Sequence, residues 1–362
     1  MPWDALTPYV GLPDLPPPGE LESKAVLKIV VEARAALARL DQATLLIPNP
    51  TVLLNTIPLL EAQASSEIEN IVTTADDLFR FAQDEGAASD PATKETLRYR
   101  NALYVGVQDV RSRALTANTA SRVCSVIKQQ DMGVRQLPGT RIANPSTEEI
   151  IYAPPEGQDV LSAKLSNWEK FLHAEDDLDP LVRMAIAHYQ FEAIHPFDDG
   201  NGRTGRILNI LMLIEAGLIR QPVIYLSRYV IKTKNDYYRL LLDVTATGSW
   251  EPWIQYMLVG VRVTAESTTH KIKAIRDLQR YVTEQIRPVS GAGRHADFRN
   301  VLFEQPYLRI QTVMDRCGVS RPTATSWLNA LVTLGILRDL KLGRDRLFVN
   351  ARFLDLLLRE EP

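Results

Sequence analysis

The stretch His195-Pro196-Phe197-Asp198-Asp199-Gly200-Asn201-Gly202-Arg203-Thr204-Gly205-Arg206 holds a histidine, two acids, three glycines and two arginines within twelve residues. A helical apolar pattern follows directly, so we expect the glycine-rich turn to lead into a helix. The first N–H groups of a helix have no partner within it, and the helix dipole favours anions there. Two arginines add donors suited to phosphate oxygens. The stretch therefore predicts phosphate chemistry beside a histidine that can accept a proton.

Length and composition indicate a soluble chain of about two domains. The 362 residues are 45% hydrophobic and 23% charged, with a net charge of −3, so nothing global indicates a nucleic-acid or membrane partner. No apolar run approaches the roughly 18–20 residues that span a bilayer, and the Pro-rich residues 1–18 lack the pattern of a signal peptide. We therefore expect a cytoplasmic protein with Cys124 and Cys317 as free thiols. The five histidines show no zinc-binding spacing.

The helical spacing of apolar residues predicts an all-α core. A segment that starts near Thr51 contains Pro58, which we expect to restart it as a short helix through about Asn70. We expect His188 to be a packed histidine rather than a second catalytic one. The other predicted helices span about residues 21–40, 75–83, 94–110, 117–131, 159–173, 180–194, 207–214, 227–245 and 250–286.

Turn signals interrupt the helical pattern at residues 137–140 and 144–147. Short extended runs at 140–143 and 149–153 flank the second turn and predict a small β-hairpin. In a helical chain, such a hairpin is either a structural brace or an edge on which a peptide docks as an extra strand. The residues alone leave both interpretations open.

A linker at residues 289–293 precedes a pattern typical of a winged helix-turn-helix. We expect helices at 310–317 and 321–334 and wing strands at 336–342 and 346–349. Residues 301–362 carry nine Arg or Lys against seven Asp or Glu, which is less basic than dedicated DNA-binding domains. Protein or intramolecular packing is therefore favoured over DNA binding. DNA contact, if it occurred, would use Arg321, Thr323, Thr325, Ser326, Asn329, Arg344 and Arg346.

The central stretch has none of the GxxxxGK[ST] order of a P-loop. It resembles the signature of the Fic family, HPFx[DE]GNGRxxR, without a departure. The segments 191–194 and 237–238 and the C-terminal pattern resemble other parts of that family. The resemblance implies three parts: an N-terminal segment (1–90) with an inhibitory helix at about 58–70, a helical catalytic core with a β-hairpin flap (91–288), and a winged helix-turn-helix domain (289–362). It also implies transfer of AMP from ATP to a Ser, Thr or Tyr hydroxyl of a target protein.

The resemblance also assigns roles to single residues. His195 would be the general base and Asp199 would hold Mg²⁺. The flap would pair with the target's backbone through Glu149, Ile150, Ile151 and Tyr152. The residues implied in ATP binding are Gly200, Asn201, Gly202, Arg203, Thr204, Gly205, Arg206, Tyr237 and Tyr238.

The segment Ser65-Ser66-Glu67-Ile68-Glu69-Asn70, taken alone, is a solvated helix end with Asn70 as a C-terminal cap. It also matches the family's inhibitory motif, [ST]xxxE[GN]. The resemblance then implies a bidentate salt bridge from Glu69 to Arg206, which would occupy the guanidinium that the γ-phosphate needs. We therefore expect the resting protein to be autoinhibited.

Other functions remain open at this stage. The same fold could transfer UMP or phosphocholine, or remove AMP with the help of Glu69. The chain could instead be a DNA-binding regulator whose core senses nucleotide, or an interaction module whose C-terminal domain recruits a target or builds a homodimer. The protein could also modify itself.

Overall fold

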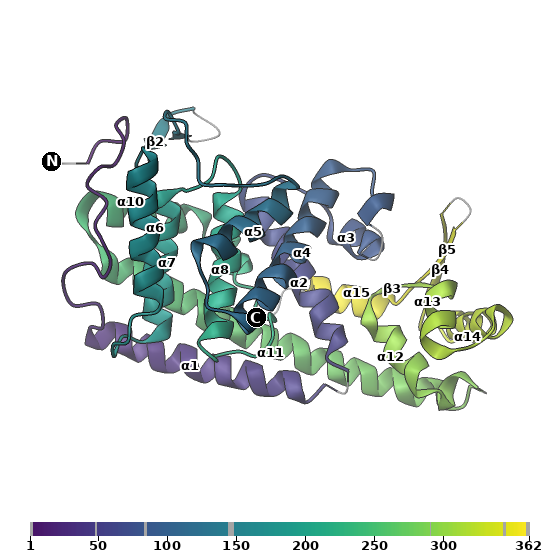
Figure 1. Cartoon of the computed structure of the whole chain (residues 1–362). Helices are drawn as coiled ribbons and strands as arrows, with labels where there is room; N and C mark the ends of the chain where they lie inside the picture. The colour runs from purple at the N-terminus through teal and green to yellow at the C-terminus, as the bar shows by residue number, and fades with distance from the viewer. Residues whose placement is uncertain are drawn as a thin grey trace.

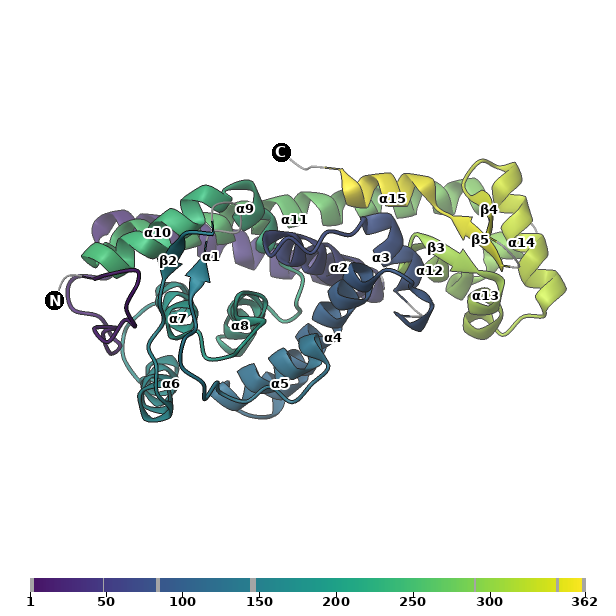
Figure 2. The same ribbon diagram turned by 90° about the horizontal axis from the view of Figure 1, so that it is seen from above.

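One long helix, α11 (Trp250–Ile286), runs through the molecule from the helical body to the C-terminal unit (Figure 1). The helix α1 (Lys24–Leu45) lies along it, as both views show (Figures 1 and 2). Apolar residues at helical spacing, from Val26 and Val30 to Leu37 and Leu40, are buried in this contact. The N-terminal helix is thereby part of the common core.

The computed structural model describes residues 3–47, 49–82, 85–143, 148–289, 291–342 and 345–359. The body is helical, which confirms the predicted fold class. Its other helices are α2 (Thr51–Ile68), α3 (Ala75–Phe81), α4 (Pro91–Ser112), α5 (Ala117–Lys128), α6 (Gln158–Leu172), α7 (Pro180–Ile194), α8 (Asn201–Glu215), α9 (Ser227–Lys232) and α10 (Lys234–Thr247). Over the residues described, no helix is both long and apolar enough to cross a membrane.

Helices α7 and α8 form the centre of the body, and Figure 2 views them nearly end-on. Both are buried on almost every side, as expected for helices surrounded by other helices. Two buried tryptophans fix neighbouring helices to α7. The indole N–H of Trp168 on α6 donates to the carbonyl of Ala187 at 2.9 Å, and that of Trp253 on α11 donates to the carbonyl of Ala185 at 2.7 Å. This packing sets the position of the turn between α7 and α8.

The prediction that Pro58 interrupts its segment is wrong, because α2 is continuous from Thr51 to Ile68. Proline has no N–H to donate to the carbonyl four residues earlier, which here belongs to Leu54. The hydroxyl of Tyr104 on α4 donates to that carbonyl instead. A neighbouring helix thus supplies the missing hydrogen bond. The segment at about 58–70 is therefore the C-terminal half of a longer helix.

Two other boundaries differ from the prediction. The helix after the glycine-rich turn begins at Asn201 rather than 207, because the turn residues from 201 onward are already helical. The helix expected at 227–245 is two helices, α9 and α10, which meet at Thr233. The Thr233 hydroxyl bonds to the Tyr229 carbonyl and to the Tyr256 hydroxyl, so the junction is held by side-chain contacts that give no local pattern.

The C-terminal unit has the two helices and the hairpin expected from the sequence, with three elements that were not predicted. The helices are α12 (Ala296–Glu304), α13 (Ile310–Cys317), α14 (Arg321–Thr333) and α15 (Ala351–Leu358). The strands β3 (Tyr307–Arg309), β4 (Arg338–Leu342) and β5 (Asp345–Val349) form an antiparallel sheet in the order β3-β5-β4. The missed elements are α12, β3 and α15. Arg344, which was placed on the wing, lies outside the residues described.

Residues 291–293 of the predicted linker form a packed turn, and Ser290 lies outside the described residues. A Cβ on Gly293 would lie 2.1 Å from the carbonyl oxygen of Ile286, so the chain folds tightly back on the end of α11. Nearer the middle of α11, the buried Nζ of Lys271 donates to the carbonyls of Leu356 and Leu357 at 3.0 and 2.8 Å. These carbonyls belong to the end of α15. The C-terminal unit is thus packed on both the end and the middle of α11, and Tyr307 of β3 also bonds to Asp76 of α3.

Candidate active site

The turn between α7 and α8 is held rigidly by its own residues and by Arg135. His195 ends α7 with a φ of 49°, and Gly200 precedes α8 with a φ of 83°. The side chain of Asn201 bonds to both the N–H and the carbonyl of Phe197, at 2.9 and 2.7 Å. Arg135 donates to the carbonyl of His195 at 2.8 Å. The predicted phosphate-binding role of Asn201 can therefore involve only its backbone, because its amide is used inside the turn.

A polar cavity of about 440 Å³ opens over this turn, and we call it the phosphate cavity. It brings together the N-terminus of α8, the histidine, both acids of the motif and the end of α2. Residues from α4 and α5 complete it. Its lining consists of Glu69, Ile71, Glu95, Lys128, His195, Asp198, Asp199, Gly200, Asn201, Gly202 and Arg203.

The pKa of His195 decides whether its ring is free to accept a proton. Burial lowers the pKa of its imidazole to about 4, and the positive charge of Arg135 contributes to the same shift. The ring is therefore neutral at physiological pH. By contrast, His188 is part of the core, as predicted: it stacks on Trp253, and its Nε2 bonds to the Tyr237 hydroxyl at 2.9 Å.

Arg206 is buried under the cavity and bonds to the end of α2. Its Nε donates to the Ser65 hydroxyl at 2.8 Å, and its Nη2 donates to the Ser65 carbonyl at 2.9 Å and to Glu69 Oε1 at 2.8 Å. The expected contact between Glu69 and Arg206 is present. The prediction that it is bidentate is wrong. Arg206 Nε and Nη2 both donate to Ser65, and only Nη2 also donates to Glu69, so a single nitrogen–oxygen contact joins Arg206 to Glu69.

The end of α2 is shaped to present Glu69 to the motif. Asn70 has a φ of 61° and caps the helix, since its N–H bonds to the Glu67 carbonyl at 3.0 Å. Glu69 then lies against Gly202, where an added Cβ would be 2.3 Å from Glu69 Oε1. Burial alone would raise the pKa of Glu69, but the charge and hydrogen bond of Arg206 outweigh it and hold the pKa below its ordinary value. Glu69 is therefore a carboxylate at neutral pH.

Two charged residues of the cavity were missed by the sequence analysis. Glu95 on α4 accepts from Arg203 Nη1 at 2.7 Å, and Lys128 at the end of α5 lies between Glu95 and Asp199. Lys128 Nζ is 2.5 Å from Asp199 Oδ2 and 3.3 Å from Glu95 Oε1. Neither residue belongs to a local motif, so only the packing of α4 and α5 against α8 reveals them.

Asp199 meets the basic requirement for the predicted magnesium ligand. Its side chain is 60% exposed, faces the cavity and offers carboxylate oxygens, which Mg²⁺ prefers. Among the described residues, no group of three or more His, Cys, Asp or Glu is arranged to hold a metal ion. A magnesium ion that enters with a nucleotide needs only one or two carboxylates, because the phosphates and water supply the other ligands.

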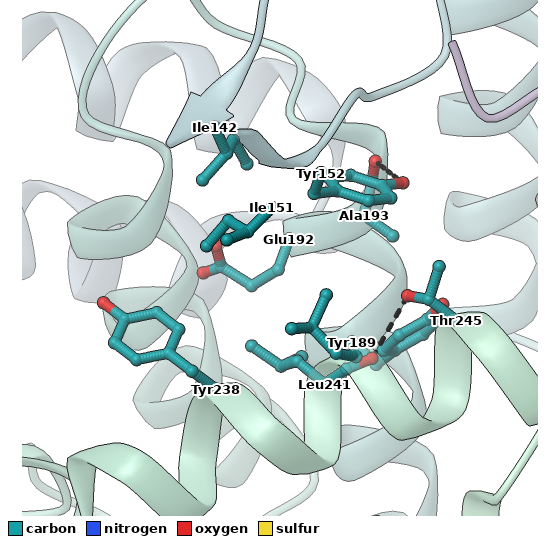
Figure 3. A pocket seen from close by; sticks show the side chains of 10 residues that line it. Ile142, Ile151, Tyr152, Tyr189, Glu192, Ala193, Tyr238, Leu241 and Thr245 are labelled. Atoms are coloured by element: carbon teal, nitrogen blue, oxygen red, sulfur yellow. Dashed lines mark hydrogen bonds between the residues drawn. The ribbon is translucent and has the colours of Figure 1, made fainter. Parts of the chain in front are cut away.

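A second, apolar slot lies under the hairpin (Figure 3). The hairpin consists of β1 (Ile142–Ala143) and β2 (Ile150–Tyr152), with Ile142 opposite Tyr152. Figure 3 shows Ile142 and Ile151 above the slot and Tyr238 and Leu241 of α10 below it. The full lining is Ile142, Ile151, Tyr152, Tyr189, Glu192, Ala193, Tyr238, Leu241, Leu242 and Thr245.

The structure separates the two tyrosines that were predicted to line one nucleotide pocket. Tyr238 lines the slot, whereas Tyr237 is buried in the core. The hydroxyl of Tyr237 instead bonds to His188 Nε2 at 2.9 Å, which keeps this ring in the core. Thr204 and Gly205, also predicted to bind ATP, do not line the phosphate cavity. Thr204 is fully buried, and Gly205 lies against Glu192, whose Oε1 would be 2.4 Å from an added Cβ.

The hairpin is anchored through Tyr152. This side chain is buried, and its hydroxyl donates to the Ala193 carbonyl at 2.8 Å (Figure 3). Ile151 points the other way along the strand, into the slot. Glu149 directly precedes β2, while the turn at 144–147 lies outside the described residues. The brace role is therefore visible, and target docking on this hairpin stays a prediction.

The amino-acid sequence matches models of known protein families in the regions that form this site. Three family models match the chain. Residues 27–108 match the model described as "Fic/DOC family N-terminal", and residues 118–213 match "Fic/DOC family". Residues 283–353 match "Protein adenylyltransferase SoFic-like, C-terminal domain". The chain belongs to the Fic/DOC family. The middle match holds the whole motif from His195 to Arg206, and the first holds Glu69.

Relatives and solved structures agree with this assignment. The chain is 35% identical over 105 residues to protein adenylyltransferase fic-1 of Caenorhabditis elegans and 36% identical over 105 residues to protein adenylyltransferase Fic of Culex quinquefasciatus. Each match covers 28% of this chain, and 19% and 20% of those proteins, so the chain spans about a fifth of their length. A Fic family protein from Desulfovibrio desulfuricans G20 shares the fold, with a TM-score of 0.55 and 20% identity over 92% of this chain and 98% of that chain.

In the C-terminal unit, two of the residues considered for DNA contact bind one another. Arg346 Nη2 donates to Asn329 Oδ1 at 2.6 Å, and the same guanidinium holds Asp339 at 2.6 to 3.0 Å. A carboxylate at this position disfavours a phosphate backbone. DNA binding by the C-terminal unit stays a prediction, and the pairing of Arg346 with Asp339 does not support it.

Proposed function

We propose that this Fic protein is a protein adenylyltransferase, which transfers AMP from ATP to a hydroxyl of a target protein and is held inactive by Glu69. One observation carries the proposal: a single cavity joins a neutral histidine to the N-terminus of α8 and to Arg203. Relatives that share 34–36% identity with part of the chain are named protein adenylyltransferases.

The proposed reaction follows from the residues of the cavity. His195 takes the proton of the target hydroxyl as its oxygen attacks the α-phosphorus of ATP. A bond from that oxygen to phosphorus forms, and the bond to the bridging oxygen of the β-phosphate breaks, releasing pyrophosphate. The N–H groups at the start of α8 stabilise the charge on the phosphate oxygens. Magnesium held by Asp199 would neutralise part of the phosphate charge.

The slot under β2 is the proposed site of the adenine ring. Glu192 and Ala193 line the slot and His195 lines the phosphate cavity, so the two spaces flank the last turn of α7. Tyr238, Ile151 and the leucines of α10 offer apolar faces for a flat ring. This neighbourhood favours a nucleotide over phosphocholine, which carries no ring.

Inhibition is proposed to act through Arg206. While Glu69 and Ser65 hold this guanidinium, it cannot also bind the γ-phosphate, and the Glu69 carboxylate repels it. ATP would then bind weakly or with its α-phosphorus displaced from His195.

The test is incubation of the full chain and of its Glu69→Gly and His195→Ala variants with ATP labelled at the α-phosphate, in the presence of lysate proteins. We expect strong transfer of label with Glu69→Gly and none when His195→Ala is added. Mass spectrometry of the labelled band identifies the modified hydroxyl and shows whether the protein labels itself. Equal labelling by Glu69→Gly and the unaltered chain would remove the inhibitory assignment. Label from UTP but not from ATP would change the substrate.

Removal of AMP is a second candidate, because the Glu69 carboxylate itself lines the phosphate cavity beside His195. A carboxylate there could orient water towards an AMP-modified side chain. A purified target labelled by the Glu69→Gly variant and then mixed with the unaltered chain distinguishes the two. Loss of AMP from the target supports removal, and retention leaves transfer as the activity.

A further inference from the structure

Four charged side chains of alternating sign line one side of the phosphate cavity, and we call them the rim cluster: Arg203, Glu95, Lys128 and Asp199. The contacts run in series. Arg203 Nη1 is 2.7 Å from Glu95 Oε1, Lys128 Nζ is 3.3 Å from the same oxygen, and Lys128 Nζ is 2.5 Å from Asp199 Oδ2. Lys128 therefore bridges two carboxylates from different parts of the chain.

Lys128 is built into the wall of the cavity rather than left on the surface. It is the last residue of α5, and its side chain is only 19% exposed. A Cβ on Gly200 would meet the Lys128 stem at 3.5 and 3.6 Å, so the stem lies against the glycine turn. The ammonium group is thus held beside the N-terminus of α8, where phosphate oxygens are expected.

The charge of the cavity lining does not by itself suit a polyphosphate. Its lining includes the carboxylates of Glu69, Glu95, Asp198 and Asp199 against the cations Lys128 and Arg203, which leaves two net negative charges when His195 is neutral. Both lining cations are paired with carboxylates. A triphosphate would be bound more strongly if at least one of these cations turned from its carboxylate to the phosphates.

We propose that Lys128 is a further polyphosphate-binding residue of this site and that Glu95 is a positioning residue that competes with the phosphates for Lys128 and Arg203. This inference rests on the proposed function. Lysine suits the exchange, since its ammonium is a compact charge on a flexible stem that can change partners. Lys128, which lies outside the motif, thereby adds a positive charge to that of Arg203.

The proposal predicts opposite effects for the two partners of one ion pair. Loss of the Lys128 charge removes a phosphate contact and weakens ATP binding. Loss of the Glu95 charge in Glu95→Gln leaves Lys128 and Arg203 facing the cavity and strengthens it. A salt bridge that served structure alone would lose the same contact in both variants, so both would change in the same direction.

The experiment is calorimetric titration of the full chain with ATP and with AMP, in EDTA and again with Mg²⁺. All variants carry Glu69→Gly, so that the contact of Glu69 with Arg206 does not mask the effect. The set comprises Lys128→Met, Lys128→Arg, Glu95→Gln and Lys170→Met, an exposed lysine of α6 that controls for the change in net charge. Lys128→Gln replaces Lys128→Met should that variant not fold.

We expect Lys128→Met to weaken ATP binding about tenfold, the effect of one charge-assisted contact, and to change AMP binding by less than about twofold. Lys170→Met should bind ATP as the parent does, Lys128→Arg should retain more affinity than Lys128→Met because it keeps the positive charge, and Glu95→Gln should bind ATP more tightly. ATP affinity unchanged in Lys128→Met, or weakened alike in Lys128→Met and Glu95→Gln, overturns the inference while the proposed function stands. A parent that binds no ATP overturns both.

Discussion

Glu69→Gln is the sharpest test of the proposed inhibition by Glu69 in this Fic protein, because it removes one charge and keeps the shape of the side chain. In the structure, Glu69 Oε1 receives Arg206 Nη2 at 2.8 Å, and the same carboxylate borders the phosphate cavity. The substitution leaves Arg206 with its two bonds to Ser65. We therefore expect a loss of stability of no more than about 1–2 kcal/mol and a clear gain in nucleotide binding.

The size of the gain follows from the exposure of the pair. Two unit charges about 4 Å apart attract by about 4 kcal/mol at the effective dielectric typical near a protein surface. Arg206 is 3% exposed but Glu69 is 36% exposed, so solvent screens the pair and desolvation offsets much of the attraction. The net interaction between Glu69 and Arg206 is therefore about 1–2 kcal/mol. Because ATP no longer has to replace this interaction in Glu69→Gln, its affinity should rise roughly tenfold.

The assay is calorimetric titration of the full chain with ATP, together with the transfer of label from α-labelled ATP. Glu67→Gln is the matched control, because this exposed residue of α2 carries the same charge and lies away from Arg206. Thermal unfolding of each variant checks the fold. ATP affinity within about twofold of the unaltered chain in a folded Glu69→Gln protein would refute the reasoning, since the carboxylate would then neither occupy Arg206 nor repel phosphate.

Three other predictions follow from buried groups. Because burial lowers the pKa of His195 to about 4, the kcat/KM of the activated variant should stay level as pH falls from 8 to about 5.5; a decline centred near 6.5 would contradict this. Tyr104→Phe should lower the free energy of unfolding by about 1–2 kcal/mol, since the Leu54 carbonyl loses its donor. Pro58→Ala restores an N–H to that carbonyl, so urea unfolding should show partial recovery in the double variant, and additive losses would rule out the explanation. Burial raises the pKa of Glu192 to about 7, above its value in the unfolded chain, so its neutral form contributes stability below pH 4.5 that is lost as pH rises through 7. Glu192→Gln should therefore raise the melting temperature at pH 8 and flatten its decline between pH 5 and 8, and an unchanged pH dependence would count against the shift.

Much of the candidate site could be predicted from residues that lie close together in the sequence. The glycines and Asn201 determine a turn before a helix N-terminus, and the structure has that turn with Gly200 in the left-handed region. The motif itself led to the family. The pairing of Glu69 with Arg206 spans 137 positions, and it was predicted only because a second short motif of the family identified the partner.

Contacts without a local pattern were not predictable. Pro58 gives a strong local signal for a helix break, but Tyr104, on another helix, supplies the missing hydrogen bond. Tyr237 and Tyr238 look alike in sequence, and only the orientation of α10 decides which of them faces the slot.

The sequence alone therefore determined the helical class, the glycine turn before a helix N-terminus, the place of His195 at that turn and the segment that carries Glu69. Each of these depends on residues close together in the chain, where backbone geometry and helix periodicity act directly. The tertiary structure alone decided that Glu69 makes one contact to Arg206, with Ser65 making the others, and that Glu95 and Lys128 join the motif. Those facts depend on how α2, α4 and α5 pack around α8, and helix packing is set by the whole core rather than by any local stretch.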